Sequence, residues 1–206
     1  NSMISLDPTT MGERENYKFL TGTIVPRPIA IVSSISNEGV VNIAPFSYFT
    51  IVSTNPPMIA VSVQRRDGHK KDTSQNILDS REFVVHITDE LNAVDANQTA
   101  AELPYNVSEL EVSDFKLTES ETVRVPGITN AKVRMECTLS KAIPLGGQVE
   151  DDASCDLIIG NITRYHIDES IYENGRINID ELRPVSRLAG NQYMKLGEKF
   201  ILERPK

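Results

Sequence analysis

The sequence contains no tryptophan and only two cysteines among its 206 residues. Cys137 and Cys155 do not form a C-x-x-C pair, and two cysteines cannot build a disulfide framework. We therefore expect buried, reduced thiols, as in a cytoplasmic protein. No apolar run approaches the roughly 20 residues of a membrane-spanning helix, so we expect no membrane partner.

Positive charge is also scarce, because 21 Lys and Arg residues face 29 Asp and Glu residues and leave a net charge of -8. This balance argues against general binding to nucleic acid or to anionic membranes, although a local basic cluster can still hold one small anion. The first residues lack the basic and apolar regions of a signal peptide, and we interpret Asn1 and Ser2 as an expression scar. We expect one cytoplasmic domain over residues 1–206.

The usual catalytic motifs are missing. The three histidines, His69, His86 and His166, lie far apart without metal-ligand spacing, and we interpret His86 and His166 as structural. The nucleophile elbow, the zinc-protease motif, the P-loop and the dinucleotide fingerprint are all absent. We therefore predict no catalytic side chain and no metal site, and we favour a bound cofactor that performs the chemistry.

Short apolar segments bounded by turns predict a mainly β protein. The expected strands cover residues 29–35, 40–44, 58–63, 82–87, 131–143 and 155–167. Between the first two, "SNEG" predicts a hairpin turn in which Gly39 takes a positive φ. Helices are predicted over 72–80, with Asp72 as N-cap, over 89–101 and, more weakly, over 108–115. This pattern favours a β-barrel with short helical insertions over a βαβ arrangement.

The segment "QRRDGHKKDTSQN", residues 64–76, concentrates basic side chains in an otherwise acidic chain. It runs directly into the predicted helix start at Asp72, where free N–H groups and a partial positive charge favour anions. The segment therefore predicts a phosphate site, and the alternative is a solvated charged loop. Arg27, held between Pro26 and Pro28, is also presented rigidly enough for phosphate or carboxylate, unless it is simply a surface arginine in a stiff loop.

The stretch "VVNIAPFSYFT", residues 40–50, begins as a strand that Pro45 interrupts. A proline removes a ladder donor, so it belongs at a strand end, an edge or a bulge. Either the break is a corner of the barrel, with its aromatic residues in the core, or it exposes backbone groups to a ligand.

Several segments, taken in order, resemble the flavin reductase-like FMN-binding split-barrel family, which includes flavoredoxin. They are "VPRPIAIVSS" (25–34), "NIAPFSYFT" (42–50), "KKDTSQNI" (70–77), "EFVVHI" (82–87), "MECTL" (135–139), "LIIGNITRYHID" (157–168) and "RPVSRLAGNQY" (183–193). No single segment is diagnostic, but the ordered set covers nearly the whole chain.

The resemblance implies a homodimeric antiparallel split barrel that binds FMN near the dimer interface. It places beside the flavin ring the residues Asn42, Ala44, Pro45, Phe46, Ser47 and Phe49. In this interpretation Pro45 ends the ladder and frees backbone groups for the flavin. On the phosphate side it places Arg27, Ser62, Lys71, Asp72 and Thr73. A C-terminal element with Arg187, Gly190 and Tyr193 would pack close to the flavin.

The function implied by the resemblance is that of an FMN-binding oxidoreductase. It would transfer hydride from NADH or NADPH to flavin and pass the electrons to a partner oxygenase, a metal ion or another electron acceptor. One alternative is a non-enzymatic flavin-binding electron carrier. A further alternative is a split barrel that has lost flavin and binds another ligand, such as haem.

Overall fold

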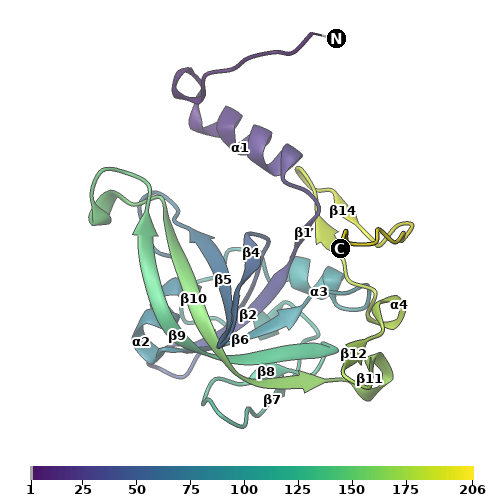
Figure 1. Ribbon diagram of the computed structural model, residues 1–206. Coiled ribbons are helices and arrows are strands. Elements are labelled where there is room, and N and C mark those ends of the chain that lie inside the picture. Colours follow the sequence, from purple (N-terminus) through teal and green to yellow (C-terminus); the bar gives the residue numbers. More distant parts are fainter. Residues whose placement is uncertain (1) are drawn as a thin grey trace.

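One curled sheet of seven antiparallel strands forms the body of the protein (Figure 1). The computed structural model describes residues 2–206, without the side chain of Glu150, and Asn1 of the predicted scar lies outside this range. The strand order is β3 (Val41–Phe46), β2 (Ala30–Ile35), β6 (Glu82–Ile87), β9 (Val133–Leu145), β10 (Cys155–Ile167), β5 (Pro57–Gln64) and β4 (Phe49–Thr54). Every pairing in this sheet is antiparallel, which confirms the predicted barrel architecture.

The hydrophobic core lies inside the curl of this sheet. Side chains from strands near both edges, such as Val32 on β2 and Val61 on β5, meet in one buried cluster. That contact requires the sheet to bend round on itself, because the two strands lie far apart in the strand order. The prediction of buried thiols is confirmed for Cys137, which belongs to this cluster and whose thiol pKa is raised to about 12 by burial, but Cys155 is only partly buried. On the outer face, Ile31 packs with Phe115, so β2 is buried on both faces.

Strand prediction succeeded where apolar residues alternate between clear turns. The bounds of β6 and β10 match the predicted segments, and β9 is shifted by two residues at each end. The predicted hairpin turn is present, and Gly39 has a φ of +85°. Strand β4 was not predicted. It is an edge strand with mostly exposed side chains, so no alternating pattern marks it.

Pro45 does not interrupt its strand. Strand β3 continues through it to Phe46, and Pro45 pairs with Ile31 of β2. The prediction that Pro45 ends the ladder is therefore wrong. Because β3 is an edge strand, one side of it has no neighbouring strand and a missing N–H is tolerated there. The chain then turns at Ser47 and Tyr48 into β4, at the opposite edge of the sheet.

The helices differ more from prediction. Helix α2 (Asp72–Ser80) has the predicted bounds, but Lys71 and not Asp72 occupies the N-cap, so Asp72 lies in the first turn. Helix α3 (Ala93–Gln98) is shorter than predicted. Residues 108–115 contain only the 3₁₀ turn η2 (Glu109–Glu111), which contradicts the predicted helix. Helix α1 (Glu13–Thr23) was not predicted, and it projects from the barrel (Figure 1).

Short elements join the barrel to the chain ends. A three-stranded sheet of β1 (Arg27–Pro28), β13 (Ser186–Arg187) and β14 (Tyr193–Met194) links the end of α1 to the C-terminal segment. The remaining elements are η1 (Pro8–Thr10), β7 (Leu117–Thr118), β8 (Gly127–Ile128), η3 (Glu150–Asp152), η4 (Glu169–Ile171), β11 (Tyr172–Glu173), β12 (Arg176–Ile177) and α4 (Ile179–Leu182). No helix within residues 2–206 is long and apolar enough to cross a membrane.

Gly160 makes close packing between β10 and the core possible. A Cβ atom at this position would lie 2.5 Å from Cζ of Phe83 and 3.3 Å from Cβ of Cys137. We expect Gly160→Ala to lower the free energy of unfolding by about 1 to 3 kcal/mol, since the buried ring must move. Urea denaturation measures this loss. Gly197→Ala is the control, because nothing lies within 4 Å of its added Cβ. Equal stability of the two variants would contradict this account of the packing.

Candidate functional site

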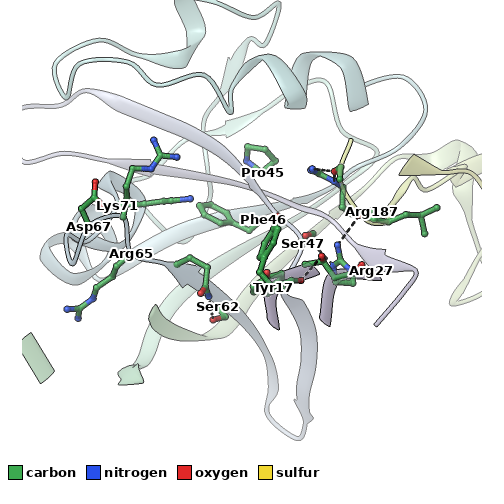
Figure 2. Close-up of a pocket in the computed structure, with 16 residues that line it drawn as sticks. Tyr17, Arg27, Pro45, Phe46, Ser47, Ser62, Arg65, Asp67, Lys71 and Arg187 are labelled. Atoms are coloured by element: carbon green, nitrogen blue, oxygen red, sulfur yellow. Dashed lines mark hydrogen bonds between the residues drawn. The ribbon is translucent and has the colours of Figure 1, made fainter. Parts of the chain in front are cut away.

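Three adjoining cavities meet at the end of β3, where Pro45 and Phe46 line all of them. Their volumes are about 490, 440 and 60 Å³. The first and second also share Lys71, and together they form a groove on both sides of Phe46. Figure 2 shows the first cavity, with Lys71 on one side of Phe46 and Arg187 on the other.

All the predicted site residues except Phe49 line one or more of these cavities. The first is lined by Arg27, Pro45, Phe46, Ser47, Ser62, Lys71, Arg187 and Gly190. The second adds Asn42, Ala44, Asp72 and Thr73, and the third adds Tyr193. Phe49 instead packs against the barrel core and lines a separate pocket beside α1. The alternative interpretation, an aromatic residue that fills the core, therefore describes Phe49 better than contact with the groove.

The start of α2 forms one end of the groove. Lys71 extends its ammonium to 5.7 Å from the centre of the Phe46 ring. Although its side chain remains partly in solvent, desolvation beside the ring lowers the pKa of Lys71, and the charge of Arg66 lowers it further. Thr73 is buried, and its Oγ1 accepts a 2.7 Å hydrogen bond from Nδ2 of Asn42. The Thr73 hydroxyl therefore keeps its own proton for donation.

Much of the predicted basic run is paired with acids. Arg65 forms a buried bidentate ion pair with Asp156, at 3.0 Å from Nε and 2.8 Å from Nη2. Arg66 forms an exposed ion pair with Glu102. Lys71, by contrast, has no ion-pair partner among residues 2–206. Lys70 likewise forms no ion pair among the described residues and lines the second cavity, so both lysines remain available to a bound anion, and Lys71 also lines the first cavity.

Two of the four carboxyl groups that line the second cavity have raised pKa values. Glu109, which sequence reasoning missed, accepts a 2.6 Å hydrogen bond from the backbone N–H of Ile43 at the open edge of β3. Desolvation raises the pKa of Glu109, and the nearby Asp72 contributes to the rise. Desolvation also raises the pKa of Asp72 itself. No local pattern indicates Glu109, because 66 residues separate it from Ile43.

Arg27 is not presented to a ligand in the way that its flanking prolines suggested. Its Nη1 donates to the carbonyl oxygens of Thr21 and Ile24, at 2.9 and 2.7 Å, and its Nη2 donates to that of Leu188 at 3.1 Å. Figure 2 places Arg27 across Phe46 from Lys71. Arg27 therefore joins α1 to the C-terminal segment, and its contact with the FMN phosphate stays a prediction.

Arg187 lies directly opposite Arg27 in the β1–β13 pairing. Its Nη2 donates to the carbonyl oxygen of Gly190 at 2.6 Å, and its Nη1 donates to Oη of Tyr193 at 3.2 Å. Gly190 has a φ of +59°, which favours glycine in this turn. Tyr17 of α1 also lines this end of the groove. It was missed because α1 itself was missed.

Comparison with known proteins agrees with this fold. Residues 21–182 match the model of the flavin reductase like domain, so the chain belongs to that family. The Bacillus subtilis protein YwrF is 46% identical over 197 residues, covering 95% of this chain and 96% of YwrF.

Solved structures give the same assignment. Nitrilotriacetate monooxygenase component B from Bacillus cereus is 54% identical, with a TM-score of 0.96 over 98% of this chain and all of that one. The Pseudomonas fluorescens 2-nitrobenzoate 2-nitroreductase NbaA is 30% identical, with a TM-score of 0.87 over 98% and 96% of the two chains. Flavoredoxin of Desulfovibrio vulgaris (Miyazaki F) is 21% identical, with a TM-score of 0.71 over 86% and 90%, and shares the fold. These findings confirm the resemblance and the split-barrel fold.

Proposed function

We propose that the protein is an FMN-dependent oxidoreductase that takes hydride from NADH or NADPH and passes electrons to a separate acceptor. The FMN phosphate would lie at the start of α2, against Lys71 and Thr73. The flavin ring would lie along the segment from Ala44 to Ser47. One observation carries this proposal: the available ammonium and the helix start open into the same groove as this segment.

The groove fits FMN in size and chemistry. Its two larger cavities, of about 490 and 440 Å³, lie within the range of small-molecule sites. The ammonium of Lys71, the hydroxyl of Thr73 and the free N–H groups of the first turn of α2 suit a phosphate dianion. Pro45 and the ring of Phe46 provide an apolar wall for a planar ring.

The chain's own residues would bind and orient the cofactor, because the described residues that line the groove include no nucleophile with an adjacent base. FMN supplies the hydride and electron chemistry when it is bound. Lys71 would fix the anionic end, and Phe46 would exclude water from one side of the groove. Positive charge from Arg187 at the other end would favour the accumulation of negative charge nearby.

Lys71→Ala tests the phosphate position. We expect FMN affinity to fall roughly ten- to a hundredfold, because a charge-assisted hydrogen bond contributes about 1.5 to 3 kcal/mol and the protein's net charge opposes the dianion. Riboflavin lacks the phosphate, so its affinity should hardly change. Titration of the variant with both flavins, followed by fluorescence quenching, gives the two dissociation constants.

Lys116→Ala is the matched control, because Lys116 is exposed and lines none of the three cavities. It should bind both flavins as the wild type does. An equal loss of FMN and riboflavin in Lys71→Ala would place Lys71 away from the phosphate. No loss of either flavin would favour the alternative interpretation, in which this charged segment binds no phosphate.

We also propose a partner oxygenase, on the likeness to the Bacillus cereus monooxygenase component. A homodimer and a cytoplasmic location remain part of the proposal. The exposed apolar side chains of Phe19 and Leu20 on α1, and of Phe200 and Ile201 near the C-terminus, support association with a second copy.

The alternative function is a non-enzymatic electron carrier. Reduction of the bound flavin by a nicotinamide would distinguish the oxidoreductase from this electron carrier.

A further inference from the structure

The end of the first cavity nearest α1 lies across Phe46 from Lys71, the residue proposed to hold the FMN phosphate. It is lined by Tyr17 of α1, by Tyr48 after β3 and by Arg187 of β13. Figure 2 shows Tyr17 beside Ser47, on the side of Phe46 away from Lys71. The groove therefore has a second compartment, with different chemistry from the compartment at α2.

This compartment carries positive charge without a neighbouring acid. Arg27 and Arg187 both line it. Among the described residues that line the first cavity, Asp67 is the only carboxylate, and Figure 2 places it beside Lys71 at the opposite end. An anion that enters this end therefore meets the guanidinium of Arg187, with the fixed charge of Arg27 nearby, and no carboxylate among the described lining residues.

Arg27 and Arg187 differ in how many N–H groups they can offer to a ligand. Three carbonyl oxygens fix the guanidinium of Arg27, so it contributes charge from a set position. Arg187 uses Nε and one hydrogen of Nη2 on Gly190, and one hydrogen of Nη1 on Tyr193. One N–H remains on each terminal nitrogen of Arg187. A planar carboxylate accepts two parallel N–H groups of this kind better than a point-like anion does.

The walls of this compartment are aromatic. Desolvation raises the pKa of the Tyr48 phenol, and the neighbouring Tyr17 raises it further, so Tyr48 stays protonated at neutral pH. Neutral phenols can donate hydrogen bonds to an anion and present ring faces to a planar ligand. Phe46 closes the side toward Lys71.

We propose that the Tyr17–Tyr48–Arg187 compartment binds the planar ring of a second substrate that carries a carboxylate, while FMN occupies the rest of the groove. This inference rests on the proposed function. A neutral carboxamide fits less well, because its NH₂ group would face the donors of Arg187. A saturated ring fits less well, because it cannot stack flat against the aromatic walls.

The test uses full-length protein loaded with FMN and three matched probes: benzoate, its uncharged analogue benzamide and the non-planar cyclohexanecarboxylate. Calorimetric titration gives each affinity. We expect benzoate to bind at least tenfold more tightly than either of the others. Arg187→Gln should weaken benzoate roughly ten- to a hundredfold, the scale of one charge-assisted hydrogen bond, and leave benzamide unchanged. Tyr17→Phe should weaken benzoate by a smaller factor.

Arg176→Gln and Tyr172→Phe are the controls, because both residues are exposed on the β11–β12 hairpin. They should bind benzoate as the wild type does. If Arg187→Gln does not fold, Arg187→Lys keeps the charge, removes the fork and should lose most of the preference for benzoate. Equal binding of benzoate and benzamide, or unchanged benzoate affinity in Tyr17→Phe and the Arg187 variants, would overturn this inference. If either of these results is obtained while the protein still binds FMN, the proposed function stands. If the wild-type protein does not bind FMN, the proposed function itself is contradicted.

Discussion

Replacing Asp156 by alanine is expected to lower the free energy of unfolding by about 3 to 5 kcal/mol. Asp156 on β10 and Arg65 at the end of β5 form an ion pair in which each side chain is only 3% exposed. Removing the carboxylate takes the bidentate acceptor away from a guanidinium that lies out of solvent. The cost of that buried charge dominates, and it is far larger than the contribution of a surface pair. Urea denaturation at neutral pH measures the loss.

Lys199→Ala is the control for this prediction. Lys199 pairs with Asp180 at 2.7 Å, but the two side chains are 57% and 67% exposed. A pair in solvent contributes about 0 to 1 kcal/mol. Similar, small losses in the Lys199 and Asp156 variants would show that water screens the Arg65–Asp156 pair, and the account of the buried pair would fail.

His86 is expected to make the protein less stable as the pH falls from about 6.5 toward 4. The imidazole is fully buried, its Nδ1 lies 2.8 Å from the carbonyl oxygen of Ile31, and its Nε2 accepts a 2.9 Å bond from the N–H of Ile128. Because the N–H of Ile128 can only donate, Nε2 has no proton and Nδ1 donates. Burial is the main cause that lowers the pKa of His86 to about 4.

The protein loses stability as the pH falls because histidine in the unfolded chain has a pKa near 6.5, above that of folded His86. Above that pH both states hold neutral His86, and its full contribution to stability is present. Below it the unfolded state gains a proton that the folded state refuses until about pH 4. The loss across this window approaches about 3 kcal/mol.

His86→Gln cannot titrate, so we expect its stability to start lower and to fall less steeply over this pH window than that of the wild type. His69→Gln, at an exposed position, should follow the wild-type curve. Chemical denaturation at a series of pH values compares the three proteins. Parallel curves for the wild type and His86→Gln would show that another group controls the acid sensitivity.

Much of the barrel could be predicted because its strands have local signals. In β6, buried Phe83 and Val85 point into the barrel core, and the turn residues before the strand set its start. Strand β4 and helix α1 lack such signals. Ile51 is 74% exposed and Phe19 is 55% exposed, so apolar residues in these segments do not mark a buried face. The isolated chain therefore gives no period from which to infer either element.

The ordered motifs indicated residues that line adjoining cavities, but they did not indicate which hydrogen bonds and ion pairs those side chains form. Nothing near Arg27 in the sequence indicates that its guanidinium reaches the carbonyl oxygen of Leu188, 161 residues away. The pairing of Arg65 with Asp156 likewise spans 91 residues. Such contacts depend on strand register across the whole sheet. A basic run in the sequence therefore identifies charge, but it cannot tell which cation remains for a ligand.

The central claim is that this groove holds FMN and that a nicotinamide reduces it there. The most direct test loads the protein with FMN, removes unbound flavin and mixes the complex anaerobically with NADH and, separately, with NADPH, while the visible flavin absorbance is followed. The account predicts retained flavin and rapid bleaching with at least one nicotinamide. Retained flavin that stays oxidised with both would contradict the reductase and favour an electron carrier, and a protein that retains no flavin would contradict the site itself.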